Sequence, residues 1–326
     1  MCQSTLRKQI SGLAIAIVGS LAIASSASAQ VIVYDGINYP NAGPFGMSIA
    51  GQSGGDSTGW GGPWASSTAG SKIATNTVTG LFYGGLSVDG GAVQVGAPQP
   101  GPGTSTAAVA QRLLPNTLGS LAAANNGVLW LSFLIYNPVY PTNTSGTSLF
   151  YRQSNLGFFS GATSGGANGS EKADLGMDNT SATVPPVFAA WGGTVTGAAP
   201  NQSTVSAFSP DTQFVLMELV VDNTAAVDTY YAWFNTDPSL FANNANTPSI
   251  STASVTNSGA DLSSVNALRF QAGGFNGNGT NAFFTVDEIR LGDSFMDVTP
   301  TPEPATMALF GIGAVGMTLL IRRRNK

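Results

Sequence analysis

Short runs of β-branched and aromatic residues recur along most of the chain, separated by clusters of Gly, Asn, Ser and Pro. Runs of this kind, bounded by turn residues, predict β-strands. The helical repeat of apolar positions is almost absent between residues 30 and 301. The predicted strands cover residues 31–34, 81–83, 85–89, 92–95, 107–114, 128–136, 148–153, 156–159, 187–191, 214–221, 230–235, 267–272 and 283–291. So many strands without intervening helices indicate an all-β fold, two antiparallel sheets packed as a jelly-roll sandwich.

The clearest predicted pair is a hairpin whose strands flank the turn-forming residues 222–226. Alternation predicts that one face of the first strand carries Val215, Met217, Leu219 and Val221. In the second strand, Tyr231 and Trp233 share a face. We therefore expect this hairpin to contribute to the core of the sandwich.

The N-terminus combines a positive charge, an apolar stretch and small residues. Arg7 and Lys8 precede an apolar segment at residues 10–23, which ends in small residues. This is the pattern of a secretory signal peptide over residues 1–29. The predicted cleavage site consists of Ala27, Ala29 and Gln30. We expect export by the Sec machinery and cutting by signal peptidase; the alternative is a retained N-terminal membrane helix.

The C-terminus has three consecutive parts with different physical properties. Pro302, Glu303 and Pro304 favour an extended, accessible backbone, because proline fixes φ and lacks an N–H donor. Residues 305–321 are apolar, and as a helix they would span about 26 Å, close to the thickness of a bilayer core. A basic tail at residues 322–326 would then stay on the cytoplasmic side. Its arginines are Arg322, Arg323 and Arg324.

This tripartite tail resembles the PEP-CTERM sorting signal of Gram-negative bacteria. The resemblance implies that a membrane transpeptidase of the exosortase type recognises Pro302-Glu303-Pro304 and cuts nearby. Residues 305–321 would hold the chain in the inner membrane only transiently, before transfer to the cell envelope, the surface or the extracellular matrix. The sorting region would occupy residues 299–326 and the folded domain residues 30–298. The alternative is a plain, uncut C-terminal anchor, although Gly311, Gly313 and Gly316 would make a weak permanent helix.

The composition excludes several classes of function. The chain has no histidine, and its single cysteine, Cys2, would leave with the signal peptide. Nucleophilic triads that need His or Cys and most transition-metal sites are therefore excluded, as are disulfides. Residues 30–301 carry six basic and 16 acidic side chains, a formal net charge of −10. Such a surface repels nucleic acid, so nucleic acid is not expected as a partner.

Three stretches carry a second resemblance. They are Tyr34-Asp35-Gly36 with the Gly-rich residues 51–64, then residues 231–238, and finally residues 284–292. Together they resemble the concanavalin A-like (LamG-type) sandwiches of lectins, glucanases and bacterial surface proteins. The resemblance implies that the first and last strands lie side by side and that a concave sheet can hold a saccharide.

The Gly-rich segment contains Trp60 and Trp64, which are candidate carbohydrate-binding residues. Glycines permit positive φ and close backbone approach, so this loop can fold tightly over an edge of the core. Indole faces stack on sugar rings, but the same side chains can instead seal the end of a sandwich. Trp130, Trp191 and Trp233 lie in predicted strands and are expected in the core.

Carboxylates are the remaining candidates for chemistry. Calcium takes oxygen ligands, which the segment 171–178, with Asp174 and Asp178, or Asp35 facing Asp287 could supply. The alternative is solvated acids that cap turns, and no cofactor is otherwise expected.

Glycoside hydrolysis needs two carboxylates roughly 5–10 Å apart. Asp287 and Glu288 are adjacent in a strand and are expected on opposite faces, and Asp222 is expected in the turn after Glu218. We therefore predict no catalytic residues. The function expected is that of an exported, non-enzymatic surface or matrix protein, with extracellular polysaccharide as the candidate ligand. The alternatives are a glycoside hydrolase, through Glu218 or Glu288, and a permanently anchored envelope protein.

Overall fold

The computed structural model describes the folded domain in segments. These are residues 31–39, 48–53, 57–66, 74–76, 80–84, 86, 88, 90–96, 108–136, 150–163, 169–179, 187–192, 203–207, 211–235, 255–272 and 283–299. The predicted signal peptide, Pro302-Glu303-Pro304, the apolar run and the basic tail lie outside the described residues. Within the described segments, no helix has the length and apolarity needed to cross a membrane.

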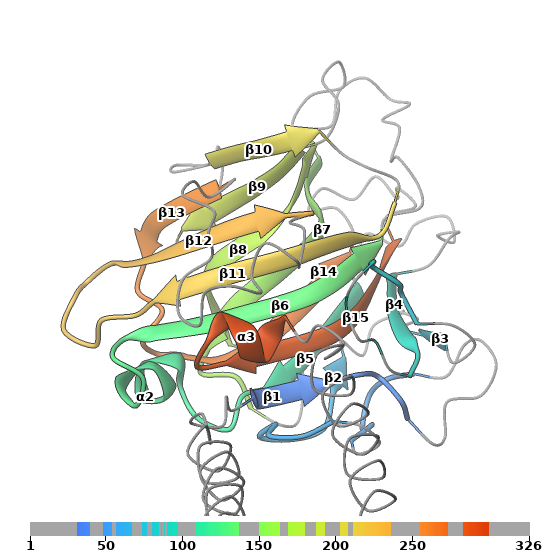
Figure 1. Ribbon diagram of the computed structural model, residues 1–326, viewed down its shortest axis with the longest axis horizontal. Coiled ribbons are helices and arrows are strands. Elements are labelled where there is room, and N and C mark those ends of the chain that lie inside the picture. Colours follow the sequence, from blue (N-terminus) through green and yellow to red (C-terminus); the bar gives the residue numbers. More distant parts are fainter. Residues whose placement is uncertain are drawn as a thin grey trace, which may run out of the picture. The chain divides into compact units, whose positions relative to one another are not determined.

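Two antiparallel sheets form the domain (Figure 1). Sheet A has the strand order β13-β12-β11-β6-β15-β4-β3, and β1 also pairs with β15. Its strands are β13 (Val255–Ala260), β12 (Asp228–Phe234), β11 (Gln213–Val220), β6 (Val128–Tyr136), β15 (Phe283–Gly292), β4 (Ala92–Gly96), β3 (Ala74–Asn76) and β1 (Val31–Asp35). Sheet B has the order β10-β9-β8-β7-β14-β5-β2. Its strands are β10 (Ser203–Ala207), β9 (Val187–Gly192), β8 (Ser170–Asn179), β7 (Phe150–Ser160), β14 (Val265–Ala272), β5 (Ala108–Leu113) and β2 (Ala65–Ser66).

The main core lies between the sheets, because alternation along each strand sends every second side chain to the facing sheet. Sheet A contributes apolar side chains such as Phe133 and Met217, and sheet B contributes Phe158 and Phe270. The rings of Phe133 and Phe270 meet edge to face across the two layers, with centroids 5.7 Å apart. The expected antiparallel β-sandwich is therefore confirmed.

A second apolar cluster covers the outer face of sheet A. Trp130 stacks on Trp233, with ring centroids 6.0 Å apart, and Phe295 meets the edge of Trp130 at 5.8 Å. Phe295 belongs to α3 (Phe295–Val298), a short helix that lies against β6 and β15 (Figure 1). The remaining helix, α2 (Leu118–Ala123), begins at Thr117, whose hydroxyl accepts from the Ser120 N–H. Trp130 and Trp233 are thus buried as expected, but outside the layer between the sheets.

The predicted hairpin is confirmed as β11 and β12, in which Met217 lies opposite Ala232. Val215, Met217, Leu219 and Val221 all join the main core. Tyr231 and Trp233 share a face as expected, but this is the outer face; Tyr230 and Ala232 face the main core instead. The expectation that the first and last strands lie side by side is also confirmed. Strand β1 pairs antiparallel with β15, and Asp35 lies opposite Ile289.

Several boundaries differ from the prediction. The described parts of the predicted strands 148–153 and 156–159 form one strand, β7, and residues 81–83 form a loop. The described part of 85–89 is also a loop. Among the described elements, five strands and two helices were not predicted, because they are short or rich in polar residues. They are β2, β3, β8, β10, β13, α2 and α3.

Candidate functional site

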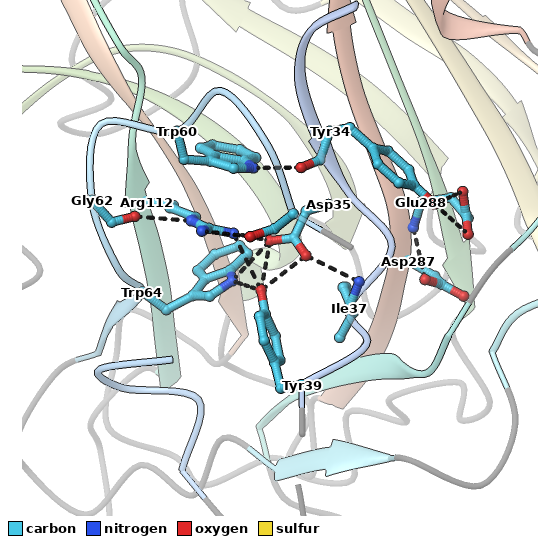
Figure 2. A network of polar contacts seen from close by, with 11 residues as sticks. Tyr34, Asp35, Ile37, Tyr39, Trp60, Gly62, Trp64, Arg112, Asp287 and Glu288 are labelled. Carbon is cyan, nitrogen blue, oxygen red and sulfur yellow. Dashed lines mark hydrogen bonds and ion pairs between the residues drawn. The ribbon is translucent and has the colours of Figure 1, made fainter. Parts of the chain in front are cut away.

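A buried ion pair joins the two sheets at the end of the sandwich (Figure 2). Asp35 lies on β1 of sheet A, and Arg112 lies on β5 of sheet B. Both side chains point inward, because Val33 and Ala110, two residues earlier on each strand, belong to the main core. Asp35 is fully buried and Arg112 is 3% exposed. The pair therefore links the two layers at a place shielded from bulk solvent.

Further donors converge on the Asp35 carboxylate. The Tyr39 hydroxyl donates to it at 2.6 Å, the Trp64 indole N–H at 3.0 Å and the Ile37 N–H at 3.0 Å. Burial raises the pKa of Asp35 above its ordinary value, while Arg112 and these donors oppose that rise. Burial and the neighbouring Asp35 also raise the pKa of the Tyr39 phenol. The phenol therefore acts as a hydrogen-bond donor and does not ionise near neutral pH.

Arg112 also organises the Gly-rich segment around itself. Its Nε donates to the Gly62 carbonyl at 3.0 Å, and its Nη2 donates to the Ser57 hydroxyl at 3.0 Å. The guanidinium carbon lies 4.8 Å from the ring centroid of Trp60 and 5.6 Å from that of Trp64. Figure 2 shows the guanidinium between the two indoles. Arg112 is thus held by ion pairing, hydrogen bonds and cation–π contacts together.

The segment with Trp60 folds directly onto β1, as its glycine content predicted. Thr58 exchanges two backbone hydrogen bonds with Tyr34, at 2.9 and 3.0 Å. Gly59 has a φ of +77°, and a β-carbon there would lie 1.9 Å from the Ile32 carbonyl oxygen. Only glycine can occupy this position without moving the strand.

The two predicted carbohydrate-binding tryptophans occupy different environments. Trp64 is 1% exposed and is part of the main core, so its ring faces are covered by protein. Trp60 is half-buried, and its N–H donates to the Tyr34 carbonyl at 2.9 Å. Trp64 therefore seals the end of the sandwich in this structure, and only Trp60 retains accessible surface.

Asp287 and Glu288 lie at a β-bulge in β15. The pairing of β15 with β6 shifts between Asp287 and Arg290, and Glu288 has a φ of +53°. As a result Val286 and Ile289, three residues apart, both face the main core. Glu288 pairs with Arg290 and accepts from the Tyr34 hydroxyl at 3.2 Å. The expectation that Asp287 and Glu288 point to opposite faces of a regular strand is wrong, because the bulge interrupts the alternation.

The Asp287 carboxylate is held by main-chain groups. It accepts from the Leu81 N–H at 2.7 Å and from the Glu288 N–H at 2.7 Å. Burial, together with the charge of Glu288, raises the pKa of Asp287 to about 9. This shift favours the protonated form of the Asp287 carboxyl at neutral pH.

Oxygen atoms gather beside Asp287. A β-carbon built on Gly80 would lie 2.8 Å from Asp287 Oδ2, 3.1 Å from the Gly90 carbonyl oxygen and 3.4 Å from that of Gly91. Calcium takes six to eight such ligands, so this set is incomplete without water. Among the described residues, no group of three or more His, Cys, Asp or Glu side chains could hold a metal. The predicted calcium site pairs Asp287 with Asp35, but the Asp35 carboxylate binds Arg112, Tyr39 and Trp64 instead. Calcium between Asp35 and Asp287 is thus not supported by these contacts.

The other predicted calcium segment, residues 171–178, is strand β8 and not a loop. Its Asp174 belongs to a polar row on the outer face of sheet B. Register places Gln111 beside Arg269, Arg269 beside Gly157, and Gly157 beside Asp174. Arg269 donates to Gln111 Oε1 at 2.6 and 3.0 Å. Strand geometry thus spreads the acids along β8 and does not wrap them around an ion.

Arg269 also stacks on an aromatic ring, with its guanidinium carbon 3.4 Å from the ring centroid of Phe159. Burial lowers the pKa of Arg269 to about 10, and the charges of Glu171 and Asp174 oppose this shift. Gln111 and Asp174 are 1% and 0% exposed, so this row offers few polar groups to a ligand. Its contacts are those of a network that holds neighbouring strands of sheet B together.

The remaining candidate acids, Asp222 and Glu218, lie in a turn and on the outer face of sheet A. Asp222 accepts from the Thr224 N–H at 2.8 Å and the Thr224 hydroxyl at 2.7 Å, which confirms it as a turn residue. Glu218 lies on the outer face of sheet A, opposite Trp130 and Tyr231 in register, and burial raises its pKa.

The sequence pattern did not identify Arg112 and Tyr39 as partners of the Asp35 carboxylate. Arg112 sits in an apolar run and is one of only six basic residues in the domain. A charged residue on the inward face of a buried strand must have a partner, and that signal points to an inward-facing acid such as Asp35.

Solved structures with a similar arrangement include three carbohydrate-related proteins. A carbohydrate esterase of the Shiga toxin-encoding bacteriophage phi24B is 10% identical, with TM-score 0.40, covering 70% of this chain and 89% of its own. Peanut lectin is 12% identical, with TM-score 0.36 and coverages of 70% and 97%. An endo-1,3-β-glucanase from Streptomyces sioyaensis is 14% identical, with TM-score 0.37 and coverages of 82% and 98%. Likenesses of this size say nothing about activity.

Comparison with curated protein sequences finds no match. A family comparison matches the segment that directly follows the last described residue, Thr299. The expected sorting signal is confirmed there: residues 300–324 match the PEP-CTERM protein-sorting motif.

Proposed function

We propose that this chain is an exported surface or matrix protein without catalytic activity, processed at its C-terminus by an exosortase-type transpeptidase. The match of residues 300–324 to a protein-sorting motif carries this proposal. The enzyme recognises Pro302, Glu303 and Pro304, residues 305–321 retain the chain in the inner membrane until it is cut, and Arg322–Arg324 orient it. Signal peptidase removes residues 1–29 during export.

The domain geometry is compatible with loss of the tail. The main core and the outer cluster of sheet A are built from residues up to Val298. Cutting near Pro302-Glu303-Pro304 would therefore remove none of the core side chains that the structure describes. The described sandwich would be left whole on the surface, which suits a structural or binding role.

Mass spectrometry of the mature protein tests the proposal. Protein recovered from the cell surface should begin near Gln30 and end near Pro304. A Glu303→Ala/Pro304→Ala variant should accumulate in the membrane with its tail attached. Surface material that retains Lys326 would show that the chain is permanently anchored.

Binding of extracellular polysaccharide is a second proposed function, and an exposed aromatic favours it. Phe82 is 70% exposed, the largest exposure among the aromatic side chains whose burial the structure describes. Its loop is held on both sides: the Leu81 N–H donates to Asp287, and the Tyr83 ring lies 5.6 Å from Phe214. A fixed, exposed ring can stack on a sugar without ordering a loop first. Trp60 could contribute the surface that it leaves exposed.

A glycan array with the fragment 30–301 tests this function. Retention on a polysaccharide should weaken in Phe82→Ala, while Val227→Ala, which truncates another exposed apolar side chain elsewhere on the domain (49% exposed), should bind normally. No retention on any glycan would leave a structural matrix protein. Turnover of a glycan that is lost in Glu218→Gln or Glu288→Gln would instead identify a hydrolase.

A further inference from the structure

The segment immediately before the sorting motif packs against the folded domain. Helix α3 ends at Val298, and the motif match begins at residue 300. Phe295 and Val298 are fully buried in the outer cluster of sheet A, and Thr299 is 1% exposed. The last described residue is therefore part of the packed domain and not of a free linker.

Hydrogen bonds hold α3 at both ends. The Ser132 hydroxyl on β6 donates to the Val298 carbonyl at 2.5 Å, and the Thr299 hydroxyl donates to the Phe295 carbonyl at 2.7 Å. At the other end, the N–H and hydroxyl of Ser294 both donate to Asp297 Oδ2 at 2.9 Å. This is a capping box that closes the helix start.

Close backbone approach adds to this attachment. A β-carbon at Gly292, the last residue of β15, would lie 2.5 Å from Asp297 Cβ. The turn from β15 into α3 is thus compact, and α3 folds back onto the strand that precedes it. Together these contacts form a clamp, which we define as residues 293–299.

The clamp limits how far the motif can reach. Four residue steps separate Thr299 from Glu303, so an extended chain places Glu303 at most about 14 Å from the buried Thr299. Release of the clamp would add residues 293–299 to the tether, which is about 25 Å more. A membrane-embedded enzyme that cuts an extended peptide needs chain on both sides of the bond, and a folded sandwich held so close would collide with it.

We propose that α3 is a releasable clamp and that the transpeptidase processes the chain only after α3 has left the outer face of sheet A. This inference rests on the proposed processing of the tail. We expect release to be local, because α3 contributes no side chain to the described main core or to the ion pair of Asp35 with Arg112. Only molecules with an open clamp are then processed, so the processing rate is proportional to the open fraction.

The test is pulse–chase labelling of the full-length chain in a host that carries an exosortase-type transpeptidase. One variant receives a six-residue Gly/Ser spacer between Thr299 and Pro300, and the control receives the same spacer between Ala226 and Val227 in an exposed turn. The first spacer lengthens the tether while the clamp stays closed, so processing should accelerate on the order of tenfold. The control should be processed at the wild-type rate.

A second pair of variants acts on the clamp itself. Phe295→Ala removes the ring that packs on Trp130 and should accelerate processing by a similar factor, whereas Phe295→Leu keeps an apolar side chain and should change it little. Equal processing of wild type, the spacer variant and Phe295→Ala would refute the clamp but leave the proposed function intact. Absence of cutting in every variant would refute both. Slower processing of Phe295→Ala together with an unaffected spacer variant would show that the enzyme uses the docked helix.

Discussion

Arg112 and Asp35 form an ion pair that crosses the interior of the sandwich, from β5 of sheet B to β1 of sheet A. The same guanidinium contacts both indoles of the Gly-rich segment. One basic residue thus fastens the first strand, the facing sheet and the loop with Trp60 and Trp64. The contacts of this loop are therefore largely internal to the fold, although the sequence makes it a candidate for saccharide binding.

Arg112→Met should be strongly destabilising. It leaves the Asp35 carboxylate buried without its cation, which costs about 3–5 kcal/mol in the free energy of unfolding. Lys172→Met, which removes a half-buried cation of β8, is the control and should stay within about 0.5 kcal/mol of wild type. Urea denaturation measures both, and equal small effects would show that the pair contributes nothing.

Trp64→Phe should be more damaging than Trp60→Phe. The first variant keeps an apolar ring but removes the N–H that donates to buried Asp35, at a cost of about 1–3 kcal/mol. The second removes a donor to the Tyr34 carbonyl at a half-buried site, where water can replace it. Thermal and urea unfolding of the two variants give the comparison. A larger loss for Trp60→Phe would contradict the core role of Trp64.

Asp287 should make stability fall as pH rises. Its folded pKa of about 9 lies above its ordinary value of 3.8, so between these values the folded state binds the extra proton. Its contribution is therefore complete at low pH and is lost as the pH rises toward about 9. Asp287→Asn cannot titrate, so its stability should decline less between about pH 5 and about pH 9 than that of wild type.

The pH experiment is done with a chelator, so that no cation keeps the Asp287 carboxylate ionised. Asp222→Asn is the control, because the Thr224 donors lower the pKa of Asp222 and it stays ionised throughout this range in both states. An identical pH slope for wild type and Asp287→Asn would show that Asp287 is ionised in the folded protein.

Gly157→Ala should disturb the polar row of sheet B. The new methyl group would lie 2.6 Å from a ring carbon of Phe159 and 2.7 Å from Asp174 Oδ1, both buried. Overpacking of this kind costs about 1–3 kcal/mol. Gly84→Ala, where no atom lies within 4 Å, should leave the melting temperature almost unchanged. Equal melting temperatures for the two variants would mean that the outer face of sheet B accommodates the added methyl group without losing stability.

Sequence pattern and residue propensity predicted the elements that depend mainly on interactions between neighbouring residues. The apolar residues 128–136 form β6 with the predicted bounds, and the β11–β12 hairpin follows from alternation around a turn. Strand β8 was missed because Glu171, Lys172, Asp174 and Asp178 interrupt its apolar pattern. Helix α3 was missed because four residues are too few for a helical repeat. Residues 81–83 look like a strand, but Leu81 is held in a loop by the Asp287 carboxylate, 206 residues later in the chain.

Local sequence patterns were enough to predict the fold class and the sorting motif, because strand alternation and the motif at residues 300–324 are properties of neighbouring residues. That Trp64 is internal, that Glu288 lies in a bulge and that α3 packs on the end of the domain follow from the three-dimensional arrangement. These depend on contacts between distant segments, such as Asp35 with Arg112 and Ser132 with Val298. No local pattern contains such contacts, since burial, register and pairing arise only when the two sheets close on each other.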